Sequence, residues 1–256
     1  MPEGDTIHRA ARRIEEALVG KEIVEIETPH PRHAHDRWPE RLSGRGVRAV
    51  DARGKHLFLR FDGDLTLHSH LRMGGLWSVH RRGEFWRRSP RRAWLVIRTP
   101  EHEVVQFDGP VLELVTDSRT RFDQQLAGLG PDVLDTHFDR ERFLARLRED
   151  DQTRPFGDAL LDQRNVAGLG NIWRAEACFH ARIDPHRPTG EVSDKESLAA
   201  IDAVRPHMAR SVAGEWPGVS IYKRAGRPCP RCGTRIASGG LGDDNRTAYW
   251  CPGCQK

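Results

Sequence analysis

Four cysteines near the end of the chain have the spacing that most directly indicates chemistry. Cys229 and Cys232 form one Cys-x-x-Cys pair, Cys251 and Cys254 form a second, and 18 residues separate the pairs. This pattern is typical of a zinc site in which four thiolates surround the ion tetrahedrally. Four thiolates leave no ligand position open for a substrate. We therefore expect one structural Zn²⁺ per chain and place the catalytic chemistry elsewhere.

The segment around these cysteines is densely basic. Its cationic residues are Arg224, Arg227, Arg231, Arg235, Arg246 and Lys256. A metal-pinned basic hairpin is typical of a protein that binds a polyanion. The whole chain has 41 Lys and Arg against 37 Asp and Glu, a net charge of +4. A nucleic-acid partner therefore requires the basic residues to gather on one face, as the hairpin sequence suggests.

The second candidate for chemistry is the N-terminus, where Pro2 and Glu3 follow Met1. Removal of Met1 would expose the secondary amine of Pro2. An α-amino group has a reference pKa of about 7.7–8.0, so part of it is neutral near physiological pH and can attack an electrophilic carbon. Glu3 could then move protons. The alternative is a processed terminus with a solvated glutamate.

Three further residues occupy positions suited to DNA contacts. Lys55 opens a strand after Gly54 and could contact a phosphate, although many such lysines are merely solvated. Met73 lies on a glycine-flanked tip and could act as a wedge between base pairs, or belong to the core. Asn171 follows a Gly-x-Gly turn that leads into a helix. Free amides at such a turn suit a phosphate, and a tight interhelical turn is the alternative.

The elements that must position these residues change character along the chain. Apolar periodicity predicts a helix over 5–19, with Asp5 or Thr6 as its cap and Gly20 as its stop. Short strands are then expected over residues 22–27, 47–52, 56–61, 65–71, 76–80, 93–98, 104–107 and 112–115. A loop is expected over 30–40. Helices are expected over residues 140–149, 155–161, 172–179 and 194–212, beyond a boundary near 120–131.

Taken together, these motifs resemble the formamidopyrimidine-DNA glycosylase and endonuclease VIII family over essentially the whole chain. The resemblance is carried by Met-Pro-Glu-Gly at the start, Gly54-Lys55-His56, the stretch from His70 to Gly75, Leu129-Gly130-Pro131-Asp132, residues 166–172 and the four-cysteine hairpin. It implies an α+β multidomain protein. Its expected parts are an N-terminal β-sandwich with an N-terminal helix (1–122), a helix–two-turn–helix domain (132–215) and a zinc finger (221–256).

The resemblance also implies a function in base excision repair. Pro2 would attack the sugar carbon of a flipped, damaged nucleotide to give a Schiff base, and Glu3 would shuttle protons. Lys55, Asn171 and Arg246 would grip the phosphates, and Met73 would fill the gap left by the base. Elimination at the sugar would then cut the strand, which makes the expected enzyme a combined DNA glycosylase and abasic-site lyase.

Two departures from the family pattern bear on the substrate. The formamidopyrimidine branch usually has a second acid at position 6, where this chain has Thr6 preceded by Asp5. That branch also has an Arg-Arg-Phe-Gly intercalation loop near residue 108, where this chain reads Phe107-Asp108-Gly109-Pro110. We therefore expect an endonuclease VIII-like enzyme that favours oxidised pyrimidines in duplex, bubble or single-stranded DNA.

A non-catalytic zinc-finger protein that binds DNA or senses damage is the competing hypothesis, because it would share the basic hairpin and the glycine turn. Pro2, Glu3 and Lys55 together favour the enzyme. The N-terminus has no apolar signal region and no run of 18 apolar residues occurs, so we expect no membrane partner and a location in the cytoplasm. We also expect a monomer that is associated with the nucleoid. Cys178 is expected to be a small buried hydrophobe.

Overall fold

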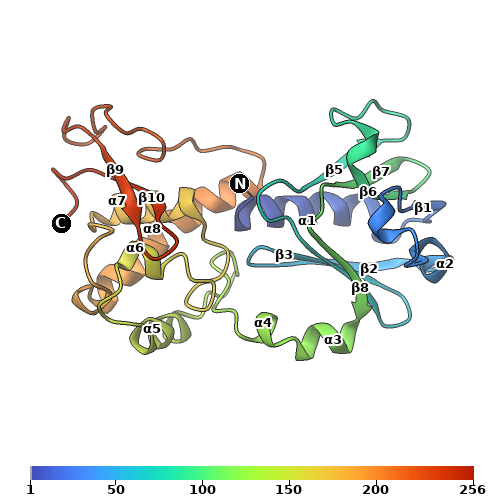
Figure 1. The fold of residues 1–256 in the computed structure, drawn as a ribbon, viewed down its shortest axis with the longest axis horizontal. Coiled ribbons are helices and arrows are strands. Elements are labelled where there is room, and N and C mark those ends of the chain that lie inside the picture. Colours follow the sequence, from blue (N-terminus) through green and yellow to red (C-terminus); the bar gives the residue numbers. More distant parts are fainter. Residues whose placement is uncertain (1) are drawn as a thin grey trace. The chain divides into compact units, whose positions relative to one another are not determined.

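The computed structural model describes residues 2–256, so the removal of Met1 lies outside the described residues. The chain divides into two compact units (Figure 1). The first contains Pro2 and Thr6–Ala127, and the second contains Glu3–Asp5 together with Gly128–Lys256. The three residues Glu3–Asp5 therefore belong to a unit whose other members follow more than a hundred positions later.

The first unit begins with helix α1 (Gly4–Leu18), whose apolar side chains Ile7, Ile14 and Leu18 are buried. Neither Asp5 nor Thr6 is the cap, because both lie inside the helix. The carboxylate of Asp5 instead accepts a hydrogen bond from the Ser211 hydroxyl at 2.5 Å, within the second unit. The expected cap was wrong because a partner far along the chain takes up that carboxylate.

Two four-stranded antiparallel sheets follow (Figure 1). One has the order β1 (Glu25–Glu27), β6 (Ala93–Arg98), β7 (His102–Phe107) and β5 (Leu76–Arg81). The other has the order β2 (Val47–Arg53), β3 (His56–Phe61), β4 (Leu65–His70) and β8 (Val111–Thr116). Alternate residues of both sheets join one core with α1, including Leu57, Leu59, Leu67, Leu95, Ile97 and Val104. The expected β-sandwich is confirmed.

The loop expected over residues 30–40 is wrong. This segment contains a 3₁₀ turn, η1 (Pro31–His33), and the start of helix α2 (Trp38–Leu42). Trp38 and Leu42 are four residues apart, so both reach the core from one face of the short helix. Helices α3 (Asp117–Phe122) and α4 (Gln124–Ala127) end the first unit, so the division between Ala127 and Gly128 lies within the boundary region expected near 120–131.

The second unit is mainly helical. Its helices are α5 (Arg140–Glu149), α6 (Phe156–Ala159), α7 (Asn171–Ala181) and α8 (Asp194–Val212), and its hairpin consists of β9 (Ala237–Leu241) and β10 (Arg246–Trp250). It also contains the 3₁₀ turn η3 (Thr189–Glu191), and another such turn, η2 (Pro90–Arg92), lies in the first unit. A capping box starts α8, because Ser193 and Glu196 exchange hydrogen bonds between side chain and backbone. Cys178 is fully buried on α7, and burial raises the pKa of its thiol to about 12.

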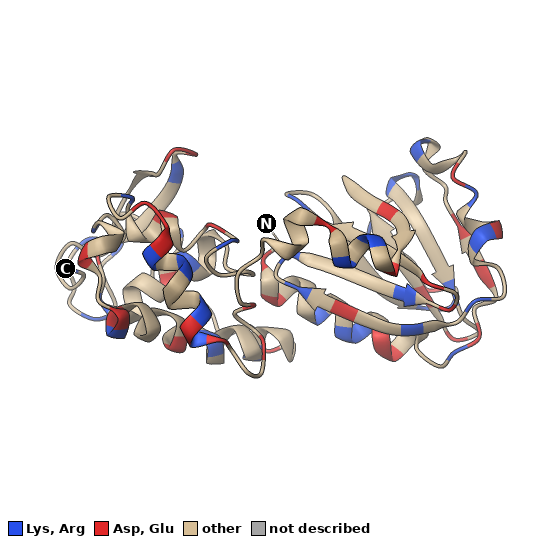
Figure 2. Cartoon of the chain, turned by 90° about the horizontal axis from the view of Figure 1, so that it is seen from below, with Lys and Arg blue, Asp and Glu red and all other residues tan. Residues whose placement is uncertain are grey.

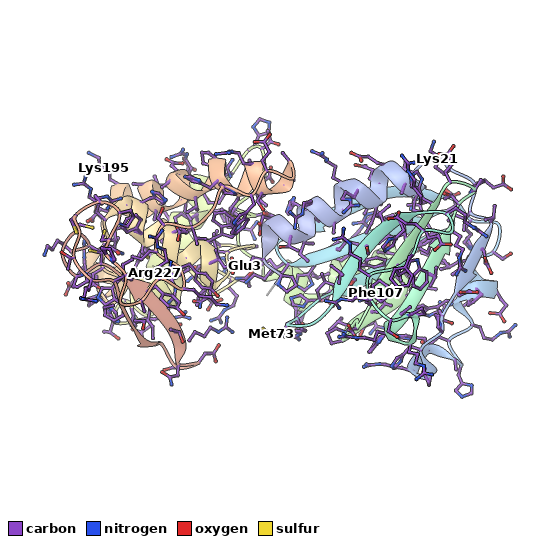
Figure 3. The ribbon with its side chains drawn as sticks, turned by 90° about the horizontal axis from the view of Figure 1, so that it is seen from above. Glu3, Lys21, Met73, Phe107, Lys195 and Arg227 are labelled. Atoms are coloured by element: carbon purple, nitrogen blue, oxygen red, sulfur yellow. The ribbon has the colours of Figure 1, made fainter. Side chains whose placement is uncertain are left out.

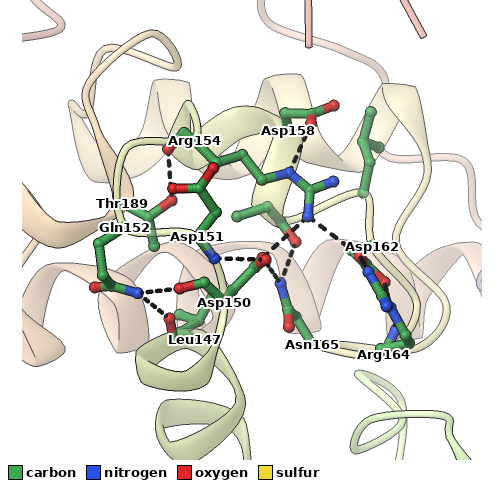
Figure 4. Close-up of polar contacts among 12 residues, drawn as sticks. Leu147, Asp150, Asp151, Gln152, Arg154, Asp158, Asp162, Arg164, Asn165 and Thr189 are labelled. Atoms are coloured by element: carbon green, nitrogen blue, oxygen red, sulfur yellow. Dashed lines mark hydrogen bonds and ion pairs between the residues drawn. The ribbon is translucent and has the colours of Figure 1, made fainter. Parts of the chain in front are cut away.

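Ion pairs brace the two turns between α5 and α7 (Figure 4). The guanidinium of Arg154 contacts Asp150 at 3.0 Å, Asp158 at 2.7 Å and Asp162 at 3.1 Å. Burial acts to raise the pKa of Asp162, but hydrogen bonds from Arg164 and Arg154 outweigh it and hold that pKa well below its usual range. These ion pairs of Arg154 stabilise the turns that lead to the start of α7.

The cysteine hairpin packs against α7 through a small apolar cluster of Ala175, Phe179, Ile221, Cys229, Ile236 and Cys251. Helices and hairpin therefore lie in the same compact unit, and their division into domains at 132–215 and 221–256 stays a prediction. Among residues 2–256, the structure contains no helix with the length and apolar character needed to span a bilayer.

Candidate functional site

The candidate residues are divided between the two units. Pro2, Lys55 and Met73 belong to the first; Glu3, Asn171, Arg246 and the four zinc-motif cysteines belong to the second. Figure 3 labels Glu3 and Met73. Each group is described within its own unit.

Glu3 is buried at the N-terminus of α7. Its carboxylate accepts hydrogen bonds from the backbone amides of Gly170 at 3.1 Å, Ile172 at 2.8 Å and Trp173 at 3.2 Å. These amides and the helix dipole stabilise the negative charge of Glu3. The expectation that the Gly-x-Gly-Asn turn offers free amides to a phosphate is therefore wrong for these three, because an internal carboxylate occupies them.

The glycines of this turn permit that close approach. A Cβ on Gly170 would lie 2.3 Å from Cδ of Glu3, and a Cβ on Gly4 would lie 2.8 Å from Cα of Gly168. The Gly4 amide also donates to the Gly168 carbonyl at 2.8 Å. The glycine-rich string therefore lets the N-terminal segment dock on the start of α7.

Asn171 connects α7 to strand β10. Its Nδ2 donates to the carbonyl of Thr247 at 3.0 Å, and Nη2 of Arg174 donates to that same carbonyl at 3.0 Å and also to Oδ1 of Asn171. Arg174 is fully buried, and burial lowers its pKa. Its Nε and Nη1 have no hydrogen-bond partner among the described residues. Asn171 is thus held beside the strand that begins with Arg246.

Arg246 itself is partly committed to the hairpin. Its guanidinium pairs with Asp244 at 2.9 Å, and 41% of its side chain is exposed. Arg231 lies over the ring of Phe179 at 4.2 Å and donates to the Phe179 carbonyl. Figure 2 shows Lys and Arg interspersed with Asp and Glu over each unit. The basic residues of the hairpin are therefore not a uniform cationic face.

The four cysteines come together as their spacing predicts. All four Sγ atoms lie within 4.8 Å of one another, with Cys229 and Cys254 at 3.9 Å and Cys232 and Cys251 at 3.4 Å. Zn–S bonds of about 2.3 Å in a tetrahedron require S···S separations of about 3.8 Å. The thiol positions therefore fit a four-coordinate metal ion.

In the first unit, Lys55 and Met73 lie on loops at strand ends. Arg53 pairs with His56 across β2 and β3, so Gly54 and Lys55 form a two-residue hairpin turn, with Gly54 at φ 59°. Met73 follows β4 and is 73% exposed. The core alternative for Met73 is therefore wrong. Pro2 is half-buried immediately before Glu3 and α1.

Sequence reasoning missed a histidine cluster on β3 and β4. Nδ1 of His56 lies 2.9 Å from Nε2 of His68, and the ring of His70 meets that of His56 at 4.8 Å. Burial, followed by the neighbouring His70 and His68, lowers the pKa of His56 to about 3. Burial and then Arg72 lower the pKa of His70 to about 4. A signal was present in the sequence, because His56 and His68 each stand next to an apolar strand residue, Leu57 and Leu67, that is buried.

Sequence reasoning also missed three residues around Asn171: Arg174, Thr247 and Tyr222. Burial raises the pKa of Tyr222, while a hydrogen bond with Asn171 acts in the opposite direction. Arg174 could have been found from its position one helical turn after Asn171, since such pairs share a helix face. Thr247 and Tyr222 could not, because only the tertiary fold brings them to α7.

Comparisons with known proteins agree along the chain. The family models described as the formamidopyrimidine-DNA glycosylase N-terminal domain and H2TH domain match residues 1–123 and 129–222. The probable endonuclease 8 2 of Streptomyces coelicolor is 42% identical, over 100% of this chain and 94% of its own length. The DNA-(apurinic or apyrimidinic site) lyase Nei2 of Mycolicibacterium smegmatis is 37% identical, over 100% and 99%.

More distant proteins share the fold. Endonuclease 8 of Escherichia coli (O1:K1) is 31% identical over the full length of both chains. The Lactococcus lactis Fpg protein, solved in complex with DNA containing N7-benzyl-Fapy-dG, superposes with a TM-score of 0.84 at 24% identity and full coverage of both chains. The expected arrangement of an N-terminal sandwich domain followed by a helix–two-turn–helix domain is confirmed.

Proposed function

Because the chain belongs to the formamidopyrimidine-DNA glycosylase and endonuclease 8 family, we propose that it is a bifunctional DNA glycosylase and abasic-site lyase acting on damaged DNA. The observation that carries the proposal is the fixed carboxylate of Glu3, held by three amides directly beside Pro2. Relatives named endonuclease 8 and abasic-site lyase support the reaction class.

Pro2 is the nucleophile in this proposal. After removal of Met1, its amine nitrogen attacks C1′ of the damaged nucleotide, and the base leaves with its bonding electrons and a proton. Opening of the sugar gives an iminium between the nitrogen and C1′. Loss of a proton from C2′ then breaks the C3′–O bond, which cuts the strand. Water hydrolyses the iminium and frees the amine.

Glu3 acts on protons and on charge. Three amide donors fix the position of its carboxylate, which in this proposal accepts a proton at the sugar and stabilises the cationic iminium. The competing role of Glu3 is a purely structural cap of α7. A Glu3→Gln variant separates the roles, because its single amide oxygen can still accept the two hydrogen bonds from Gly170 and Trp173 but carries no charge. We expect folding to be retained and elimination to be lost.

The remaining proposed residues hold the DNA and the fold. Lys55, Asn171 and Arg246 contact phosphates around the lesion, and the exposed Met73 fills the space of the extruded base. The four cysteines hold one structural Zn²⁺, which fixes the hairpin that carries Arg246. The protein acts as a monomer, which light scattering during gel filtration would test.

The substrate is an oxidised pyrimidine in preference to an oxidised purine. The turn from β7 to β8 is short and contains Asp108 and Gly109, without large side chains that could fill the duplex. Selectivity must therefore depend on pocket shape and on Met73, and bases that are already unpaired cost less to extrude. A panel of single-lesion duplexes, bubbles and single strands under single-turnover conditions tests this. Fastest processing of oxidised guanine opposite cytosine would contradict it.

Borohydride trapping on an abasic-site duplex tests the chemistry itself. Intact-mass analysis should show a protein without Met1, and peptide mapping should place the reduced adduct on residue 2. Pro2→Ala retains a primary amine, so residual trapping by that variant is compatible with the proposal. An adduct on Lys55 would overturn the assignment, and binding with no adduct would favour the non-catalytic DNA-binding protein.

A further inference from the structure

The loop between β5 and β6 is the most basic short segment of the first unit. Residues 81–92, the arginine loop, contain one acidic residue, Glu84, and six arginines: Arg81, Arg82, Arg87, Arg88, Arg91 and Arg92. A run of arginines is often no more than a solvated surface. The ion pairs of these arginines and the aromatic residues of the loop decide whether it can bind a ligand.

Half of these arginines are neutralised within the unit. Arg82 pairs with Glu25 at 3.5 Å and Glu103 at 3.9 Å, and Arg88 and Arg92 pair with Asp108 at 2.7 and 2.6 Å. The side chains of the other three, Arg81, Arg87 and Arg91, are exposed and make no ion pair or hydrogen bond with residues 2–256. Three positive charges therefore remain available to a ligand.

Two contacts of Trp86 attach the loop to strand β7. The indole Nε1 donates to Glu103 at 2.8 Å, and the ring meets that of Phe107, labelled in Figure 3, edge-on at 5.7 Å. At the loop's start, the Arg81 amide donates to the Glu84 carboxylate at 2.9 Å. The half-buried Trp86 anchors the loop, whereas the side chain of its neighbour Phe85 is 87% exposed.

The same loop is joined to the tip that carries Met73. Nη1 of Arg88 donates to the Gly74 carbonyl at 3.1 Å while it pairs with Asp108. Asp108 lies in the turn where the formamidopyrimidine branch has its intercalation loop and where this chain has none. That turn therefore serves as an anchor that connects the arginine loop to the Met73 tip in one continuous surface.

We propose that the arginine loop is an additional DNA-binding surface that contacts the strand flanking the lesion. Arg81, Arg87 and Arg91 bind phosphates, and Phe85 stacks on a base or sugar of that strand. An acidic protein would satisfy the arginines equally, but an exposed aromatic ring beside unpaired arginines is suited to stacked bases. Continuity with the Met73 tip, which rests on the proposed function, places the loop along the path of a bound DNA.

The test compares two duplexes that contain the same unreactive abasic analogue. One ends a few base pairs from the lesion, and the other extends more than a helical turn beyond it on each side. On the long duplex, the combined change Arg81→Gln, Arg87→Gln and Arg91→Gln should reduce the log–log salt slope of binding by about 2–3 units. A third substrate, the long duplex with a single-stranded flank, tests stacking. Phe85→Ala should weaken binding to it by about 5- to 100-fold.

Lys21→Gln is the matched control, because it removes a positive charge from an exposed position in the same unit, away from Met73 (Figure 3). Its slope should follow that of the unmodified protein on both duplexes. A loss of affinity confined to the long duplex supports the proposal. Unchanged affinity for the long duplex, or an equal loss of affinity for both duplexes, overturns the proposal that the loop binds DNA. Binding of an acidic protein to the loop would not restore it. Because the analogue does not react, this result is independent of whether Pro2 forms an adduct.

Discussion

His56, His68 and His70 illustrate how single residues of this protein depend on their surroundings. The pKa of His56 is lowered to about 3 by burial and then by His70 and His68, against an ordinary value of 6.5. Below pH 6.5 the unfolded chain therefore binds more protons than the folded chain. The stability contributed by neutral His56 is complete above pH 6.5 and decreases as the pH falls toward its folded pKa.

We expect the strands β3 and β4 to lose protection by a few kcal/mol between pH 7 and pH 4.5, since each unit of pKa shift corresponds to about 1.4 kcal/mol. Hydrogen exchange of peptides from these strands, corrected for intrinsic pH effects, measures this. In His56→Gln the pH dependence should be weaker. The same dependence in both proteins would show that other groups determine it.

Lys55, Asn171 and Arg246 provide a second prediction at this scale. Lys55→Ala and Arg246→Ala should each flatten the salt dependence of DNA binding by about one log–log unit, because each removes one cation from a phosphate. Asn171→Ala should weaken binding without changing the slope, since the amide is neutral. Affinities measured over several flanking sequences should fall uniformly. Unchanged affinity for all three variants would exclude the phosphate contacts.

At the scale of elements, the start of α7 is where Glu3 and Gly4 of the N-terminal segment contact the helices of the second unit. Gly170→Ala would place a Cβ 2.3 Å from Cδ of Glu3, so the carboxylate must leave its three amide donors. We expect a loss of about 2–4 kcal/mol in the free energy of unfolding, as is typical of steric conflict with a buried hydrogen-bonded charge. Thermal or denaturant unfolding checks this.

Gly239→Ala is the matched control in the same unit, because its Cβ would meet Trp250 at 3.5 Å, an ordinary contact. It should change stability by less than about 1 kcal/mol. If Gly170→Ala were as stable as this control, the Glu3 carboxylate would not be confined at α7 in solution.

At the scale of the whole molecule, the metal ion and the sandwich contribute separately to stability. The hairpin core is small and includes two of the cysteines, whereas the first unit has its own large apolar core. Removal of Zn²⁺ by a chelator should therefore loosen β9, β10 and the contacts of Asn171 with Thr247, while the sandwich stays folded. DNA binding should be lost at the same time.

Metal analysis should find one zinc per chain, and hydrogen exchange should show deprotection confined to the second unit. Cys232→Ser should reproduce the chelator's effect. Cys178→Ser is the matched control, because Cys178 is fully buried on α7 and lies outside the four-cysteine group. It should keep the zinc. Retention of one tightly bound zinc by Cys232→Ser would contradict the four-thiolate site.

The sequence by itself determined those features that depend on neighbours along the chain. Helices α5 and α8 have the predicted bounds because periodicity and caps are local, and the two cysteines within each Cys-x-x-Cys pair lie close together because one tight turn joins them. The sandwich strands were located by alternation and turn residues for the same reason, with β1 shorter than expected.

Tertiary structure alone decided how side chains meet across long separations. Glu3 reaches amides 167–170 positions away, Asp5 meets Ser211, and Arg88 bridges Asp108 and Gly74. The histidine cluster likewise depends on the register of β3 against β4. A residue type indicates what a group can bind, but its partner is set by which elements pack together, and many distant residues determine that packing at once.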